Sequence, residues 1–181
     1  MNKTSLRKKI LKLRKKKYSK NLSISFTKLS KFLKKKKIKP KIIGGYYPFN
    51  YEFNILDILG IFEKQNLIIS LPKISQKNKM DFFQWSTKEP LKINKFGIPE
   101  TTSKKKVYPN IFLIPLVGFD RQLNRLGYGG GYYDRYLTKV QNKYRIIKIG
   151  VGFSSQQIKN IPINKHDKKL DCIITEKKII E

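Results

Sequence analysis

Glycines, acids, cations and aromatic residues gather between positions 118 and 137, and together they could bind a phosphate or carboxylate ligand. Gly127, Gly129, Gly130 and Gly131 remove four side chains within five residues, so the backbone can adopt positive φ angles and its N–H groups can approach a ligand closely. The polar and aromatic residues around them are Asp120, Arg121, Arg125, Tyr128, Tyr132, Tyr133, Asp134 and Arg135. A plain turn does not require so many polar and aromatic side chains around it.

The flanking segments predict the elements that position this loop. Residues 111–117 form an apolar run typical of a buried strand, and residues 132–141 have helical spacing. A strand, a glycine loop and a helix N-terminus in that order suit an anion. The two common phosphate-binding fingerprints are absent, so this stretch alone leaves a plain turn and an anion site as open alternatives.

The charge of the chain suggests a second function class. Its 181 residues include 41 Lys and Arg against 12 Asp and Glu, a formal net charge of +29. Such an excess is typical of proteins that bind nucleic acid or another polyanion, so a basic nucleic-acid-binding protein is the alternative. A compositional bias towards lysine would give the same pattern, and the aromatic residues cluster with glycines and acids rather than with the lysine runs.

Length and composition favour a single domain over residues 1–181. The only cysteine, Cys172, excludes an internal disulfide and favours a reducing compartment. No apolar stretch approaches the roughly 20 residues of a membrane span, and the N-terminus lacks the apolar core of a signal peptide. We therefore expect a soluble, cytoplasmic protein without a membrane partner. The expected oligomeric state is a monomer.

A basic helix is predicted over residues 3–17, with Leu6, Ile10 and Leu13 on its apolar side and Asn2 or Thr4 as its cap. Its narrow apolar stripe leaves several cations that we expect to project from the helix: Lys3, Arg7, Lys8 and Arg14. Without further context, a solvated charged face explains them.

The remaining elements alternate in type along the chain. Helices are predicted at residues 24–36, 53–64 and 132–141, and strands at 41–47, 67–71, 111–117, 145–153 and 172–175. Segments 80–85 and 91–93 suggest a small antiparallel excursion before a polar loop at 95–106. The strand, helix and strand between residues 41 and 71, with short joints, predict a βαβ unit, whose parallel strands need covered faces. Since ligands bind beyond the carboxyl ends of such strands, Tyr47, Glu52 and Lys73 should share a rim with the glycine loop.

With these pieces in place, the chain resembles the 5-formyltetrahydrofolate cyclo-ligase family nearly end to end. The shared motifs are K-x-x-L-R at residues 3–7, YYPFNYE at 46–52, LPK at 71–73, GIPE at 97–100, GFDRQLNRLGYGGGYYDRYL at 118–137, GFSSQQ at 152–157 and PINKHDKKLD at 162–171. The central motif is highly specific only in combination with the others.

The resemblance implies a three-layer α/β/α fold around a largely parallel sheet, which agrees with this order of elements. It also implies a reaction that closes a ring. In the family, ATP phosphorylates the formyl oxygen of 5-formyltetrahydrofolate, nitrogen 10 attacks the activated carbon, and phosphate departs to leave 5,10-methenyltetrahydrofolate. A formamide is a poor electrophile because its nitrogen lone pair is delocalised, and phosphorylation supplies a leaving group. Catalysis then depends on alignment and charge neutralisation. The implied cofactors are ATP and Mg²⁺, and the implied partner is a small-molecule folate, with or without a polyglutamate tail that a basic rim would attract.

Site residues follow from the resemblance position by position. Arg125 and Tyr132 are the implied catalytic residues. The implied ATP-binding residues are Lys3, Arg7, Arg125, Leu126, Gly127, Tyr128, Gly129, Gly130, Gly131, Tyr132 and Tyr133. The implied substrate-binding residues are Tyr47, Glu52, Tyr128, Gly129, Gly130, Gly131 and Tyr132. Asp134 and Asp167 are the implied magnesium ligands, as hard oxygen donors suit this ion.

One position departs from the family pattern. Family members usually have glycine two residues before the arginine of the loop, where this chain has Leu123. We expect the bend to move to Asn124, because asparagine tolerates positive φ better than leucine. His166 adjoins an implied metal ligand without a role of its own, and Asp171 either supports Asp167 or starts the last strand.

Overall fold

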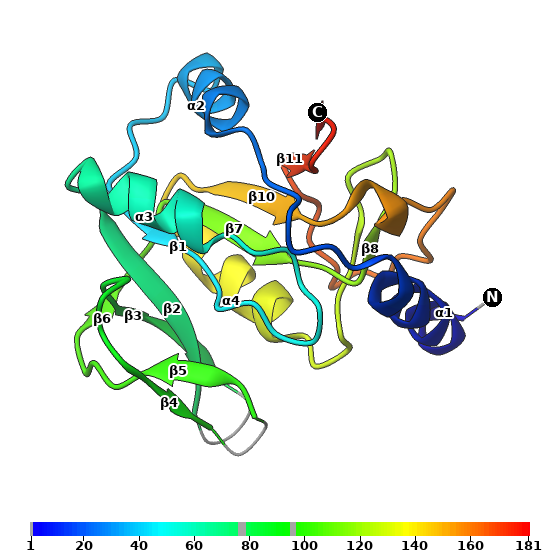
Figure 1. Cartoon of the computed structure of the whole chain (residues 1–181), viewed down its shortest axis with the longest axis horizontal. Coiled ribbons are helices and arrows are strands. Elements are labelled where there is room, and N and C mark those ends of the chain that lie inside the picture. Colours follow the sequence, from blue (N-terminus) through cyan, green and yellow to red (C-terminus); the bar gives the residue numbers. More distant parts are fainter. Residues whose placement is uncertain (1, 76–78, 95–96) are drawn as a thin grey trace.

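The computed structural model describes residues 2–75, 79–94 and 97–181, and its centre is one eight-stranded sheet (Figure 1). The strands lie in the order β12 (Ile179–Ile180), β11 (Cys172–Ile174), β10 (Ile147–Val151), β7 (Ile111–Pro115), β1 (Ile42–Gly44), β2 (Ile68–Ile74), β3 (Met80–Gln84) and β6 (Lys106–Val107). The five strands from β11 to β2 are mutually parallel, and β12, β3 and β6 are antiparallel to their neighbours. The largely parallel sheet is therefore confirmed.

Helices cover both faces of this sheet because β7 is apolar on both sides. Ile111 and Leu113 face a core that includes residues of α2 (Phe26–Lys35) and α3 (Leu56–Lys64). Phe112 and Ile114 face a second core with Tyr136, Leu137 and Val140 of α4 (Tyr132–Gln141). This alternation follows the two-residue period of a strand and confirms the three-layer arrangement.

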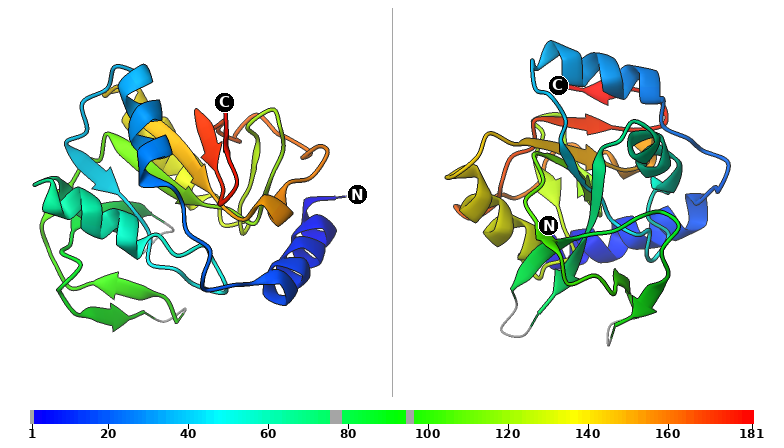
Figure 2. Two further views of the ribbon diagram at one scale, coloured as in Figure 1. Left: turned by 45° about the horizontal axis from the view of Figure 1, so that its top comes forward. Right: turned by 90° about the vertical axis from the view of Figure 1, so that its left-hand side faces the viewer.

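The first helix, α1 (Lys3–Lys17), lies beyond the carboxyl ends of the strands instead of on a face of the sheet (Figures 1 and 2). Asn2 caps it through a hydrogen bond from the Ser5 N–H at 2.9 Å. Its Leu6 and Ile10 pack in a small cluster with Val117, Leu126 and Ile161. Its buried positions are therefore Leu6, Ile10 and Arg14, not the expected Leu13.

Several predicted boundaries were too generous. The strand expected at 41–47 ends at Gly44, and the helix expected at 53–64 begins only at Leu56, since the buried Phe53 belongs to the preceding loop. β3 joins the main sheet, and β4 (Leu91–Ile93) pairs instead with β5 (Pro99–Thr101). The expected loop 95–106 therefore contains β5 and the first residue of β6; its positions 95 and 96 lie outside the described residues.

The charged turn before the glycine loop is a small hairpin of β8 (Gly118–Phe119) and β9 (Arg125–Leu126). Asp120 is fully buried inside it, and its carboxylate accepts hydrogen bonds from the N–H groups of Gln122, Asn124 and Ile161 at 2.9, 3.0 and 3.1 Å. This buried acceptor fixes the turn that leads to Arg125.

Leu123, not Asn124, takes the left-handed conformation in this turn, with φ at +67°. The expected transfer of the bend to Asn124 is wrong, and the reason is packing. Leu123 packs its side chain against the core that contains Tyr136, its N–H donates to the Asp120 carbonyl, and its carbonyl accepts from the Leu170 N–H. These contacts together hold a conformation that leucine ordinarily avoids.

Among the described residues, no helix combines the length and apolarity needed to cross a bilayer. The Cys172 thiol is unpaired and fully buried in the core, where burial raises its pKa.

Candidate active site

A cavity of about 1100 Å³ opens beyond the carboxyl ends of the strands, between α1, the glycine loop and the segment that follows β1. Every residue implied by the resemblance lines this cavity. These are Lys3, Arg7, Tyr47, Glu52, Arg125, Leu126, Gly127, Tyr128, Gly129, Gly130, Gly131, Tyr132, Tyr133, Asp134 and Asp167. Of the rim residues expected from strand order, Lys73 does not line it, because its Nζ donates to the Ser103 carbonyl.

The glycine loop needs its glycines at two positions for backbone reasons. Gly129 has φ at +109°, and Gly131, the N-cap of α4, has φ at +65°. A Cβ at Gly129 would also lie 3.3 Å from the guanidinium carbon of Arg7. Arg7 Nε donates to the Gly127 carbonyl at 2.8 Å, so α1 and the loop form one surface.

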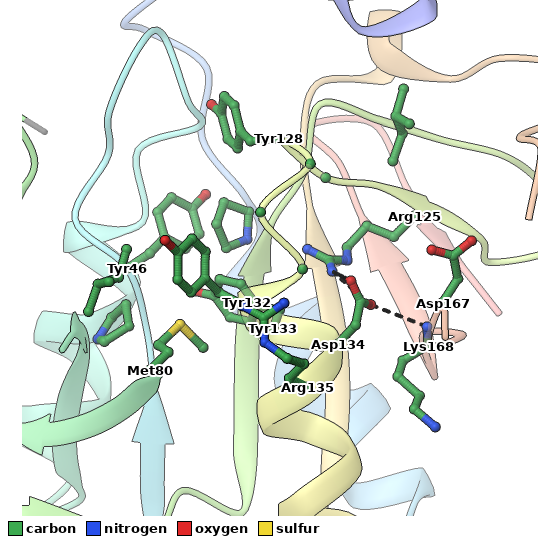
Figure 3. Close-up of a pocket in the computed structure, with 18 of the residues that line it drawn as sticks. Tyr46, Met80, Arg125, Tyr128, Tyr132, Tyr133, Asp134, Arg135, Asp167 and Lys168 are labelled. Carbon is green, nitrogen blue, oxygen red and sulfur yellow. Dashed lines mark hydrogen bonds and ion pairs between the residues drawn. The ribbon is translucent and has the colours of Figure 1, made fainter. Parts of the chain in front are cut away.

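Cations and carboxylates are paired on this side of the cavity (Figure 3). A guanidinium nitrogen of Arg125 lies 3.0 Å from both carboxylate oxygens of Asp134, which also accepts the Lys168 N–H at 3.2 Å. Lys3 Nζ lies 2.5 Å from Asp167. The side chain of Arg125 is almost fully buried, so a phosphate bound here would meet fixed rather than mobile charges.

Two buried polar atoms beside this pair have no hydrogen-bond partner within the described residues: Arg125 Nε and the Tyr133 hydroxyl. The Arg125 guanidinium lies over the Tyr133 ring, 5.4 Å from its centre. Burial and the nearby Glu52 charge raise the pKa of Tyr133, so its hydroxyl stays protonated and can donate. Buried polar atoms are nearly always paired in proteins, and these two are placed to pair with a ligand.

Aromatic and apolar side chains form the other side of the cavity. In Figure 3, Tyr46 and Met80 lie across from the Arg125–Asp134 pair, with Tyr132 and Tyr133 between them. Such walls suit a flat ring system. The chemistry thus changes from ionic to aromatic across one continuous cavity.

Glu52 is the buried carboxyl group of the aromatic side. Its two oxygens accept hydrogen bonds from the Tyr128 hydroxyl at 2.9 Å and the Phe49 N–H at 3.0 Å. Burial raises the pKa of Glu52 to about 7, against the opposing effect of these hydrogen bonds and of Arg14. Its charge therefore changes near neutral pH.

Sequence reasoning missed Arg14, which was expected to project from α1 but is only 1% exposed. Its guanidinium donates to the carbonyls of Leu116 and Asn50 and to the Tyr128 hydroxyl. The signal was present, because positions 6, 10 and 14 follow one another at four-residue spacing along one side of the helix. Arginine's charge obscured it.

The structure also locates His166 and Asp171, which lie close to Asp167 in the sequence. His166 lines the cavity beside Asp167. Asp171 accepts the Lys148 N–H at 2.7 Å at the start of β11, so of its two expected roles the structure supports the start of the last strand.

A largely parallel α/β sheet whose cavity combines a cationic glycine loop with aromatic walls, beyond the carboxyl ends of the strands, is the arrangement typical of α/β proteins that bind small-molecule ligands. The model of the 5-formyltetrahydrofolate cyclo-ligase family matches residues 1–176. The chain therefore belongs to this family and is a ligase.

Individual relatives agree with this family. A 5-formyltetrahydrofolate cyclo-ligase of Haemophilus influenzae is 35% identical over 141 residues, covering 74% of this chain and 75% of the relative. A probable 5-formyltetrahydrofolate cyclo-ligase of Schizosaccharomyces pombe is 32% identical, covering 68% of each chain. A solved 5,10-methenyltetrahydrofolate synthetase of Mycoplasma pneumoniae superposes with a TM-score of 0.71 at 29% identity, over 97% of this chain and 99% of that one.

Proposed function

We propose that this chain uses ATP and Mg²⁺ to convert 5-formyltetrahydrofolate to 5,10-methenyltetrahydrofolate, with release of ADP and phosphate, through a phosphorylated formyl intermediate. Family membership supports the cyclo-ligase activity. The observation that carries the finer proposal is the single cavity in which a glycine loop with three cations adjoins an aromatic subsite with a buried carboxyl group.

The ionic side would hold the triphosphate. Arg125, Arg7 and Lys3 supply positive charge, and the loop from Gly127 to Gly131 leaves room for close approach of backbone N–H groups. The chain lacks the lysine of a P-loop, so these cations come from β9 and α1 instead. Bound phosphate would share the cations that now pair with Asp134 and Asp167.

The aromatic side would hold the folate ring. Glu52 as a carboxylate accepts hydrogen bonds from the amino and ring N–H groups of a pterin, while Tyr47 and Tyr132 would border the ring. This placement leaves the formyl group facing the ionic side. Phosphorylation turns its oxygen into a leaving group, and nitrogen 10 then attacks the formyl carbon, closing the ring as phosphate and the nitrogen 10 proton leave. The residues' contribution is alignment and charge neutralisation.

Asp134 and Asp167 are the proposed magnesium ligands. Both line the cavity and offer the hard oxygen donors that Mg²⁺ prefers, usually as one or two carboxylates beside phosphate oxygens and water. Among the described residues, no group of three or more acidic, histidine or cysteine side chains is arranged to hold a metal ion, and a site of two carboxylates completed by phosphate oxygens and water does not require one. The ion would neutralise phosphate charge.

The decisive experiment mixes purified protein with MgATP and 5-formyltetrahydrofolate and follows the absorbance of the methenyl product. We expect product only when both ATP and magnesium are present. Folded protein, verified by circular dichroism, that gives no ATP-dependent absorbance change would refute the proposal. Turnover that persists after removal of magnesium with a chelator would refute the metal requirement alone.

A further inference from the structure

Arg14 occupies an unusual position for a cation, because it is buried on the inner side of α1 and bonded to Tyr128, which lines the cavity. It is 1% exposed. One guanidinium nitrogen donates to the Leu116 carbonyl at 3.2 Å, and the other donates at 2.6 Å to both the Asn50 carbonyl and the Tyr128 hydroxyl. Arg14 thus joins α1 to the end of β7, to the loop before Glu52 and to the glycine loop.

The loop held by Arg14 is a strained turn. Asn50 and Tyr51 both adopt positive φ, at 49° and 61°, and the Glu52 N–H donates to the Phe49 carbonyl at 3.0 Å. Two successive positive φ angles are those of a type I′ turn, which favours asparagine followed by glycine. Tyr51 stands where glycine is favoured, so the turn depends on outside contacts, of which the Arg14 bond to Asn50 is one.

Arg14 also fixes the direction of a proton. A tyrosine hydroxyl has one proton to donate, and a guanidinium can only donate. Because Arg14 donates to the Tyr128 oxygen, the hydroxyl proton of Tyr128 points to Glu52 at 2.9 Å. Glu52 thus receives hydrogen bonds from Tyr128 and Phe49, and its remaining lone pairs serve as acceptors in the cavity.

The titratable groups that face Glu52 come from four parts of the chain. Arg14 of α1 is the cation, and the other titratable groups are the phenols of Tyr46 after β1, Tyr128 of the glycine loop and Tyr133 of α4. Burial and the charge of Glu52 raise the pKa of each of these three tyrosines, so they stay neutral near pH 7. Arg14 is then the charge that favours ionised Glu52.

We propose that Arg14 is a positioning residue that orients the Tyr128 hydroxyl and the turn before Glu52, so that Glu52 presents an ionised carboxylate to the ligand's N–H groups. Naming the ligand as a pterin rests on the proposed function. α1 then serves both subsites, with Lys3 and Arg7 at the phosphate end and Arg14 two turns later at the ring end.

The first test needs no activity. Carbon-13 NMR of labelled glutamate, with the Glu52 signal assigned by its loss in Glu52→Gln, gives the titration midpoint of this carboxyl group. In Arg14→Met we expect the midpoint to rise by about 1 pH unit, since a nearby opposite charge is lost. Lys8→Met removes an exposed cation of the same helix and should leave the midpoint unchanged. Equal midpoints in Arg14→Met and the wild type would overturn the proposal.

The second test separates positioning from general support of the fold. From the ionised fraction of Glu52, Arg14→Met should raise the KM for folate about fivefold at pH 7 and hardly at pH 9, relative to wild type. The KM for ATP should stay unchanged. Loss of kcat at every pH without this KM pattern would indicate a purely structural role. If the wild type shows no turnover, the proposed function fails, while the NMR midpoint still decides the role of Arg14.

Two milder variants keep the proposal testable if Arg14→Met fails to fold. Tyr128→Phe keeps Arg14 and removes only the hydroxyl that donates to Glu52, so the Glu52 midpoint should rise while the fold persists. Arg14→Lys keeps the charge without the planar fork; its midpoint should stay nearer the wild type than that of Arg14→Met. An unchanged Glu52 midpoint in Tyr128→Phe would contradict the proposed hydrogen bond from the Tyr128 hydroxyl to Glu52.

Discussion

At the scale of single residues, the buried Glu52 should make the stability of the fold depend on pH. Its pKa is raised from about 4.5 to about 7 by burial. Between these values the folded protein holds a proton that the unfolded chain has released, so folding binds a proton there. The free energy of unfolding should therefore fall as pH rises from 4.5 to 7, and then level off.

Glu52→Gln should remove this pH dependence. A rise of about 2.5 in pKa corresponds to roughly 3 kcal/mol at most, so the wild type should lose up to that amount of stability between pH 4.5 and 8, and the variant much less. Urea denaturation of both proteins at several pH values measures the difference. Parallel stability curves would show that Glu52 titrates normally in the folded protein.

Asp134 is the residue at which ion pairing and proposed metal binding meet. Asp134→Asn keeps an oxygen that can accept from Arg125 and from the Lys168 N–H, so the protein should fold with a loss of about 2 kcal/mol. Turnover should fall about 100-fold or more, since a fixed charge at the reacting phosphate is removed. The absorbance assay and thermal unfolding measure the two effects.

The matched control for this variant is Asp57→Asn, an exposed acid in the first turn of α3. It should keep full turnover. An Asp134→Asn enzyme as fast as this control would remove Asp134 from the proposed metal site.

At the scale of elements, the positive φ of Leu123 should reverse the usual stability order of alanine and glycine variants. Leu123→Ala loses packing but keeps positive φ, whereas Leu123→Gly loses the same packing and relieves the strain. We expect Leu123→Gly to be more stable than Leu123→Ala by about 1 kcal/mol, although glycine ordinarily destabilises. Chemical denaturation of both variants tests this, and the ordinary order, alanine above glycine, would mean that the strain is relieved elsewhere.

α1 should be separable into a ligand-binding end and a packing end. Deleting residues 1–8 removes Lys3, Arg7 and the buried Leu6 but leaves Ile10 and Arg14 in place. ATP affinity should fall at least about tenfold through lost charge-assisted hydrogen bonds, while Tm falls by only about 5 °C. Calorimetric titration with a non-hydrolysable ATP analogue measures the first quantity. An unchanged affinity would contradict the assignment of Lys3 and Arg7 to phosphate.

Sequence patterns predicted elements best where periodicity and length were unambiguous. α1 and α4 match their predicted residue ranges, and the buried strands β7 and β10 lie within theirs. The predicted ends of strands were wrong where apolar residues continue past the strand into a loop. Tyr46 after β1 is an example, because its burial comes from tertiary packing and not from strand pairing. The last strand, β12, was missed because two residues give no period.

The location of the site followed from the sequence, but its internal contacts did not. Every residue implied by the resemblance lines the cavity, whereas Lys73, expected there from strand order alone, does not. The pairings of Lys3 with Asp167 and of Arg14 with Tyr128 join residues more than 100 positions apart. No local pattern encodes such partners. The roles of these residues in turnover stay predictions.

At the scale of the whole molecule, the net charge of +29 would attract anionic substrates to the cavity as much as it would attract nucleic acid. If it serves the proposed reaction, polyglutamylated folate should have a lower KM than monoglutamate at low salt. The difference should shrink as salt screens the charges, over a Debye length of about 10 Å at 0.1 M. Equal constants for both substrates at low salt would leave the charge without this role.

RNA and DNA serve as the contrasting ligands in the same experiment. Binding of either that weakens steeply with salt and competes with turnover would favour the alternative reading of the charge. The cellular compartment stays a prediction, and one relative from Arabidopsis thaliana is named mitochondrial.

The ion pair between Lys3 and Asp167 spans 164 positions of the chain. During synthesis, α1 and most strands of the sheet precede Asp167, the residue that pairs with Lys3 at the start of α1. The end of the cavity at Lys3 and Asp167 therefore cannot be complete until residue 167 has been added to the chain. Because closing so long a loop is slow compared with local pairing, this ion pair should form after the sheet whose strands lie between its two partners in the sequence.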